Sequence, residues 1–285
     1  MLFNSVEFLL FLPLVLVMYW AITGTGGELR SGSGALRVQN LLLLVASYVF
    51  YGWWDWRFLG LIALSTVVDY AVGLQIGKAN SQEIPPGADK KARSPKAKRW
   101  LFVSILVNLG LLGYFKYANF FIESWVDAWA AVGVTMHASS LQIILPVGIS
   151  FYTFQTMSYS IDLYRRRLEP THDFIAFAAF VSFFPQLVAG PIERANELLP
   201  QIERHRKFDY DFAVSGLRLI LWGLFKKSVI ADTCALYVNE TFSHYDQHNA
   251  PTLILGAIFL PFRSMETSAD IQTSPSEQPD FSAFA

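Results

Sequence analysis

Seven apolar stretches, each close to the length of a membrane span, dominate what this chain can fold into. They lie near residues 3–22, 38–54, 58–77, 100–117, 141–161, 174–191 and 212–231. One helical span needs roughly 20 apolar residues, so these stretches occupy about half of the chain. The pattern predicts an all-α polytopic membrane protein, with about six spans and one irregular segment.

The overall composition supports a membrane protein and excludes several other classes. Hydrophobic residues make up 53% of the 285 residues and charged residues only 16%, whereas soluble chains carry about a quarter charged residues. The net charge of −1 offers no basic excess for nucleic acid. The single cysteine, Cys234, closes no intramolecular disulfide and makes no zinc site. The sequence therefore predicts no metal and no nucleic-acid partner.

The charges of the loops predict an orientation in the membrane. Residues 78–99 hold seven Lys or Arg against two acidic residues, which places this loop in the cytoplasm by the positive-inside rule. A patch for anionic lipid or nucleic acid is the alternative interpretation of the same charges. Counting spans from this loop puts the N-terminus outside, residues 119–140 outside and the arginines at 165–167 inside. The first apolar stretch is interpreted as a permanent helix, with a cleaved signal peptide as the alternative.

Residues 174–192 do not fit a simple span. If they crossed the membrane, Arg194 and the basic residues at 204–207 would lie outside. Pro185, Gly190 and Pro191 also interrupt the segment, and interrupted backbone at membrane depth needs protein or a water-filled cavity around it. We therefore expect a re-entrant segment that returns to the cytoplasmic side, with Gln186 as a lining residue.

Polar residues inside apolar stretches are the remaining candidates for function, because charge at membrane depth is costly. Asp69 lies four residues from Ser65 on one helical face; a structural, hydrogen-bonded role is favoured over a catalytic one. Lys226 and Lys227 lie in an apolar stretch and would need a cavity or a lipid headgroup. The aromatic run at 51–58 is interpreted as an interface anchor.

The character of the chain changes after residue 262. An apolar start at 251–262 is too short to span a bilayer, and residues 263–285 are rich in Ser, Pro and acidic residues. A disordered cytosolic tail is one interpretation. The other is a frameshift, because codons compatible with 262–277 give QIYGDFSGYSDIAIG when they are read two bases later. We expect a transmembrane part at 1–262 and an unrelated tail at 263–285.

Several long strings together resemble the membrane-bound O-acyltransferase family, in the branch of the alginate O-acetylation proteins. They are MLFNSVEFLLFLPLVLVMYW, FYGWWDWRFLGLIALSTVVDY, YFKYANFF, ILPVGISFYTFQTMSYSIDLYR, FPQLVAGPIER and LILWGLFKKSVIAD. The resemblance covers residues 1–262. It implies acyl transfer, most simply of acetyl, to hydroxyls of an exported polysaccharide such as alginate. The acyl donor would be acetyl-CoA or another activated acyl group, the location the bacterial inner membrane, and the partners extracytoplasmic acyltransferases.

The resemblance also implies site residues. FPQLVAGPIER corresponds to the family's re-entrant, funnel-lining element, which makes Pro185, Gln186, Gly190, Pro191 and Arg194 candidate lining residues. The family's catalytic histidine is expected beyond Phe262, and none of the five histidines lies in a matching motif, so no catalytic residue is assigned. The chain alone is then expected to be inactive. A transporter, permease or acyl-group exporter is the alternative, although no inverted repeat is visible.

Overall fold

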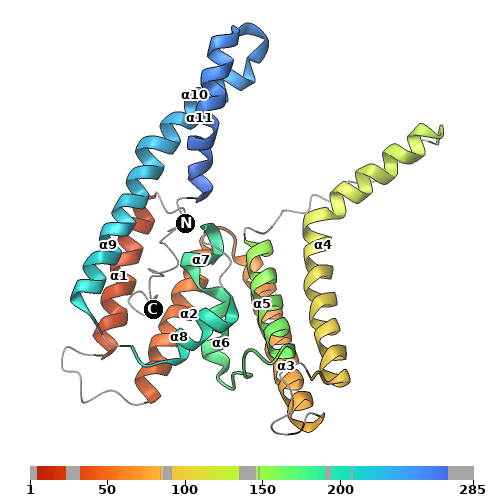
Figure 1. Ribbon diagram of the computed structural model, residues 1–285, viewed down its shortest axis with the longest axis vertical. Coiled ribbons are helices and arrows are strands. Elements are labelled where there is room, and N and C mark those ends of the chain that lie inside the picture. The colour runs from red at the N-terminus through yellow and green to blue at the C-terminus, as the bar shows by residue number, and fades with distance from the viewer. Residues whose placement is uncertain are drawn as a thin grey trace. The chain divides into compact units, whose positions relative to one another are not determined.

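The computed structural model describes residues 5–23, 33–83, 85, 92–134, 146, 148–189, 194–206 and 208–268. Within these ranges every regular element is a helix (Figure 1), which confirms the predicted all-α class. The chain divides into two compact units. One unit is Gly32–Arg204, and the other combines Met1–Ser31 with His205–Ala285.

The unit Gly32–Arg204 is a bundle of long helices with three short ones against it. Its α-helices are α2 (Ser33–Gly52), α3 (Leu59–Glu83), α4 (Pro95–Ala131), α5 (Ile149–Tyr164), α6 (Phe174–Ser182), α7 (Phe184–Ala189) and α8 (Ala195–Glu203). Helix α3 packs against both α4 and α5, and α2 packs against α6. The fully buried core includes Ile62, Ile76, Tyr159, Phe177 and Phe180.

Short polar residues set where these helices begin. The Ser94 hydroxyl accepts a hydrogen bond from the Ala97 amide and Pro95 follows it at the first turn of α4, as is typical of helix N-termini. Asp173 accepts in the same way at the start of α6. Asp55 accepts from the Arg57 amide and starts the 3-10 turn η1 (Trp56–Phe58) that leads into α3.

The second unit contains one N-terminal helix and a long C-terminal helical run. Its elements are α1 (Val6–Thr23), α9 (Tyr210–Phe225), the π-helix η2 (Lys226–Ala231), α10 (Asp232–Ser243), the 3-10 turn η3 (Tyr245–Gln247) and α11 (Ala250–Ser268). Helices α10 and α11 pack against each other as a hairpin (Figure 1). The Arg206 guanidinium, which is buried, donates to the Tyr19 hydroxyl within this unit.

Among the residues that the structure describes, three helices are long and apolar enough to cross a membrane: Gly34–Gly52, Trp56–Glu83 and Pro95–Ala131. Shorter apolar helices occupy Val6–Ile22, Phe174–Leu187 and Ala250–Phe262. The protein is therefore an all-α membrane protein, as the sequence predicts. Fewer helices meet the length criterion than the number of predicted spans, because several predicted spans begin late or are divided.

Two predicted boundaries are wrong in detail. The predicted outside loop at 119–140 is helical as far as Ala131, because no Gly or Pro interrupts residues 114–131. The predicted span at 141–161 begins as helix only at Ile149; residues 141–145 and 147 lie outside the described residues. Helix α11 continues to Ser268, and the rest of the predicted tail lies outside the described residues. The domain boundary at 262 stays a prediction.

The segment predicted to be re-entrant is broken. Phe183 leaves the helical conformation, with φ −53° and ψ 105°, between α6 and α7. These helices have nine and six residues, so neither is long enough to cross a bilayer. This interruption agrees with the broken backbone predicted for the segment, whereas its depth in the membrane stays a prediction.

Candidate functional site

The densest polar cluster of the unit Gly32–Arg204 surrounds Asp69 on α3. The Asp69 side chain is fully buried. One carboxylate oxygen accepts from the Ser104 hydroxyl at 2.6 Å and from Asn108 Nδ2 at 3.0 Å. The other accepts from the same amide nitrogen at 2.8 Å and from the Ser65 hydroxyl at 3.4 Å. Asp69 thus ties α3 to α4.

Helix α5 completes the cluster with two hydroxyls. Thr156 Oγ1 donates to Asn108 Oδ1 at 3.2 Å, and Ser104 Oγ lies 3.0 Å from Ser160 Oγ. Each of the three helices therefore contributes a polar pair spaced four residues apart, and residues four apart share one helical face. We name these six residues the polar knot. It consists of Ser65, Asp69, Ser104, Asn108, Thr156 and Ser160.

The polar knot is suited to holding helices together rather than to bond chemistry. None of the ion pairs between described residues involves Asp69, and its two oxygens are occupied by hydroxyl and amide donors. The cluster contains no nucleophile paired with a histidine base, the arrangement expected of covalent catalysis. These contacts are those of a hydrogen-bonded residue that joins helices, and the role of Asp69 in function stays a prediction. The α4 and α5 members were missed, although the four-residue polar spacing is visible in both apolar stretches.

Gln186 lies in a second buried contact, between α7, α5 and α6. Gln155 Nε2 donates to the Phe180 carbonyl at 2.8 Å and lies 3.2 Å from Gln186 Oε1. The backbone amide of Phe184, the first residue of α7, donates to the Ser47 hydroxyl of α2 at 3.2 Å. These bonds satisfy backbone and amide groups at the break in the helix, as an interrupted segment in a membrane requires. Sequence analysis singled out Gln186 but not its partner Gln155.

The other predicted lining residues are placed differently. Pro185 is half-buried in α7, and Arg194 is exposed at the start of α8. Gly190 and Pro191 lie outside the described residues. The described part of the chain therefore places Gln186 in a packed polar contact and Arg194 at the surface. Whether these residues line a funnel stays a prediction.

Gly148 brings α5 close to α7. This residue starts α5 with φ +77°, and a Cβ atom here would meet the Leu187 carbonyl oxygen at 2.8 Å. Glycine is required on both counts, because an L side chain is strained at this φ and has no room. Gly148 lies in the string ILPVGISFYTFQ quoted above, but only the structure shows that this glycine permits the close approach of α5 to α7.

Lys226 and Lys227 begin the π-helix η2 in the second unit. Lys227 Nζ lies 2.9 Å from Asp232 Oδ1, and Lys226 Nζ lies 6.0 Å from the centre of the Trp222 ring. A carboxylate and an aromatic face thus accompany these ammonium groups, so a lipid headgroup is not needed to explain Lys227. π-Helical turns are frequent at functional sites, but no described residue gives this turn a reacting group.

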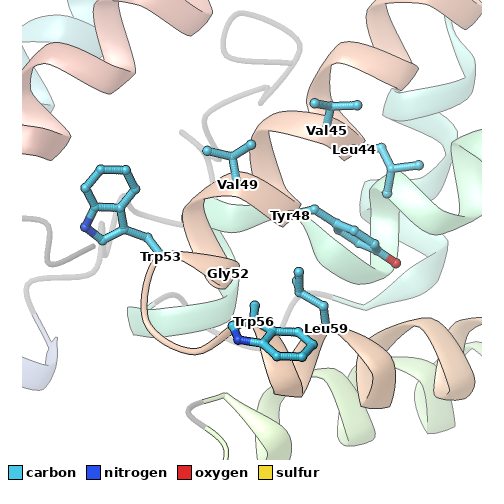
Figure 2. A pocket seen from close by; sticks show the side chains of 8 residues that line it. All are labelled: Leu44, Val45, Tyr48, Val49, Gly52, Trp53, Trp56 and Leu59. Atoms are coloured by element: carbon cyan, nitrogen blue, oxygen red, sulfur yellow. The ribbon is translucent and has the colours of Figure 1, made fainter.

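An open apolar groove lies where α2 ends and α3 begins (Figure 2). Its volume is about 530 Å³, and it is lined by Leu44, Val45, Tyr48, Val49, Gly52, Trp53, Trp56 and Leu59. Trp53 and Trp56 belong to the aromatic run predicted to anchor the protein at the interface. The lining carries no charged group, so the groove fits apolar material and offers no acid or base.

The histidines provide no catalytic constellation in the part of the chain that the structure describes. No group of three His, Cys, Asp or Glu side chains there is arranged to hold a metal ion. His172, His205, His244 and His248 are described, whereas His137 lies outside the described residues. The expectation that the catalytic histidine lies beyond Phe262 stays a prediction.

The fold and the buried polar contacts thus define a polytopic α-helical membrane protein with a broken segment in its bundle. Comparison with known proteins shows which proteins this chain resembles in sequence. The chain is 42% identical over 244 residues to the probable alginate O-acetylase of Pseudomonas aeruginosa, which covers 85% of this chain and 42% of that protein. It is 41% identical over 247 residues to the probable alginate O-acetylase of Azotobacter vinelandii, covering 86% and 44%.

A third relative is named for a different polymer. The chain is 33% identical over 229 residues to the peptidoglycan O-acetyltransferase of Helicobacter pylori, covering 71% of this chain and 40% of that protein. No family model matches and no solved structure matches. The chain spans less than half the length of these curated relatives. The predicted resemblance to the alginate O-acetylation branch of the membrane-bound O-acyltransferases is confirmed.

Proposed function

We propose that this chain forms the N-terminal part of a membrane O-acetyltransferase that esterifies hydroxyls of an exported polysaccharide. The observation that carries the proposal is the 42% identity to a probable alginate O-acetylase over 85% of the chain. The three relatives described above are named acetylases or acetyltransferases, so the transporter alternative is not favoured. The acceptor is a polysaccharide hydroxyl, and the acyl donor is acetyl-CoA or another activated acetyl group.

The described residues would serve this reaction by building the walls of the bundle. The polar knot holds α3, α4 and α5 together, and the Gln155–Gln186 contact fixes the broken segment against them. A rigidly held framework of this kind would keep the reacting groups of an acyl-transfer site in place. The general base, a histidine in this family, is assigned to sequence beyond Phe262.

The proposal also includes a location and partners. The basic loop at 78–99 faces the cytoplasm of a bacterial inner membrane, and the N-terminus lies outside. The acetyl group enters from the cytoplasmic side and leaves toward extracytoplasmic acyltransferase partners. Cysteine-accessibility labelling of intact cells at Ser81 and at Glu123 tests this orientation, because only the second position is then reached by an impermeant reagent.

A chimera tests the activity. Residues 1–262 are joined to the remaining sequence of the Pseudomonas aeruginosa relative and expressed in a strain that lacks its own polysaccharide O-acetylase. Alkali-labile acetyl esters on the exported polysaccharide are the expected product. The 285-residue chain alone, expressed to the same membrane level, should produce none. A chimera that accumulates in the membrane yet gives no esters, while the intact relative does, contradicts the proposal.

A further inference from the structure

Helix α4 is much longer than a membrane requires. Its 37 residues extend about 55 Å at 1.5 Å per residue, whereas a bilayer measures roughly 30 Å across its hydrocarbon core and roughly 40–45 Å with headgroups. The buried residues of α4 end at Leu112. Residues 113–131, which we name the α4 extension, therefore continue past the part of α4 that packs against α3 and α5.

The α4 extension has two different faces. At 100° per residue, its large apolar side chains cover about two-thirds of the helix surface. Tyr117, Phe121, Trp125 and Trp129, spaced four residues apart, lie within that surface, which we name the aromatic face. The charged and amide side chains of the extension form a narrow stripe on the other side. That stripe consists of Lys116, Asn119, Glu123 and Asp127.

The aromatic face is largely exposed, and the ring contact between Trp125 and Trp129 lies within the α4 extension itself. Phe121 is 65% exposed and Trp125 is 59% exposed. Isolated exposed aromatics are ordinary, but a continuous stripe of this size normally marks a surface that binds something. Figure 1 shows α4 running beside α5 and then bending away from it. The α4 extension is therefore not parallel to the part of α4 in the bundle.

We infer that the α4 extension lies in the interfacial layer of the lipid bilayer, with its aromatic face in the headgroup and acyl boundary and its acidic stripe in water. The spanning part of the same helix delivers the extension to that layer, so no other anchor is needed. Trp and Tyr are the side chains that favour membrane interfaces. Lys116, at the junction, has its ammonium 5.5 Å from the Tyr117 ring centre, a position from which it reaches the headgroups.

The charges of the stripe define the kind of lipid surface. Glu123 and Asp127 are its acidic residues, and residues 119–131 contain no Lys or Arg. Most interfacial helices carry basic residues that attract anionic lipids; this one has none beyond Lys116. Insertion therefore depends on apolar contact, and it should be indifferent to salt and equally deep in zwitterionic and anionic membranes.

Spin labelling tests this placement without reference to activity. Cys234 is replaced by Ala in the full chain, and single cysteines are then introduced by Phe121→Cys or Trp125→Cys on the aromatic face and by Glu123→Cys or Asp127→Cys on the acidic stripe. Each nitroxide is measured in phosphatidylcholine vesicles by power saturation with oxygen and with a water-soluble nickel chelate. The ratio of oxygen to nickel accessibility should be several-fold higher at the two aromatic-face positions.

The outcomes separate the possible occupants of the aromatic face. High nickel accessibility at all four positions means that the extension stands in water, and this result overturns the inference. Low accessibility to both reagents on the aromatic face means that protein covers it, and this also overturns the inference. If cysteine variants accumulate poorly, Trp125→Phe with Trp129→Phe is the second measurement. That variant should lose the share of the tryptophan quenching by headgroup-proximal brominated lipid that these two residues contribute, and quenching equal to that of the unchanged chain overturns the inference.

Discussion

Removing the Asp69 carboxylate should destabilise the bundle through its bonds to α4. Asp69 accepts from Ser104 at 2.6 Å and from Asn108 at 2.8 and 3.0 Å, all fully buried. Hydrogen bonds between membrane helices average about 0.6 kcal/mol and reach about 1.7 kcal/mol. The Asp69–Ser104 bond, at 2.6 Å, is the shortest in the cluster. Its coupling should therefore lie at the upper end, about 1–2 kcal/mol.

Two opposing effects decide whether the single substitution Asp69→Ala raises or lowers the free energy of unfolding. Asp69→Ala removes a buried carboxylate that no described cation accompanies, which relieves a desolvation cost. It also removes the acceptor that Ser104 and Asn108 share in the packed interior, and leaving a buried donor unsatisfied typically costs about 1–3 kcal/mol. The second effect dominates because the stranded donors cannot reach water. Asp69→Asn keeps one acceptor oxygen and should fall between Asp69→Ala and the unchanged chain.

A double-mutant cycle measures the coupling. The chain is unfolded reversibly by dodecyl sulfate in mixed micelles, followed by far-UV circular dichroism, for Asp69→Ala, Ser104→Ala and the double variant. Ser124→Ala is the matched control, because it makes the same change on the same helix at an exposed position. A coupling energy below about 0.5 kcal/mol, the usual limit for independent sites, would refute the reasoning.

Three glycines give further tests by the same unfolding assay. A Cβ at Gly73 of α3 would lie 2.6 Å from the ring of Tyr159, which is fully buried and cannot move aside, so Gly73→Ala should cost about 1–3 kcal/mol. Gly60→Ala, on the same helix with nothing within 4 Å, should instead stabilise by up to about 1 kcal/mol; equal effects would contradict the packing. Gly148→Ala combines φ +77° with a 2.8 Å approach to the Leu187 carbonyl. It should destabilise more than Gly73→Ala and, in the chimera, lower ester formation at equal expression. Unchanged ester formation would show that α7 tolerates displacement.

The sequence predicts the fold class because hydrophobic length is a local property. Stretches such as 58–77 exceed what a soluble helix needs, and α3 forms there. Predicted helix ends are wrong where a stretch looks like a loop but contains no residue that stops a helix. Residues 119–131 carry charged residues that suggest a loop, yet they contain no Gly or Pro. The interruption near Pro185 is predicted because Pro cannot continue a regular helix from the preceding turn. Its position at Phe183 depends on the Ser47 hydroxyl of α2, which sequence spacing does not reveal.

Of the candidate site, the sequence predicts only contacts between residues that are close together in the chain. Ser65 and Asp69 are four residues apart on one helix and can be paired from the sequence. The contacts of the polar knot between helices join residues 35 to 56 positions apart in the chain, such as Asp69 with Ser104 and Ser104 with Ser160. Such pairs depend on tertiary packing. Gln186 was singled out from its motif, whereas Gln155 lies on α5 with no local signal that it faces α6 and α7.

The polar knot also explains how three apolar helices find one register in lipid. The hydrophobic effect does not favour one alignment over another there, because lipid tails are as apolar as the side chains. Each helix instead contributes one pair of the polar knot at four-residue spacing, and the pairs satisfy one another only when they lie at the same level. Sliding α4 by one turn would move Asn108 about 5.4 Å from Asp69 and leave a carboxylate and several donors without partners in a medium that offers none. Each buried polar group left without a partner costs about 1–3 kcal/mol, so the polar knot favours one alignment of α3, α4 and α5.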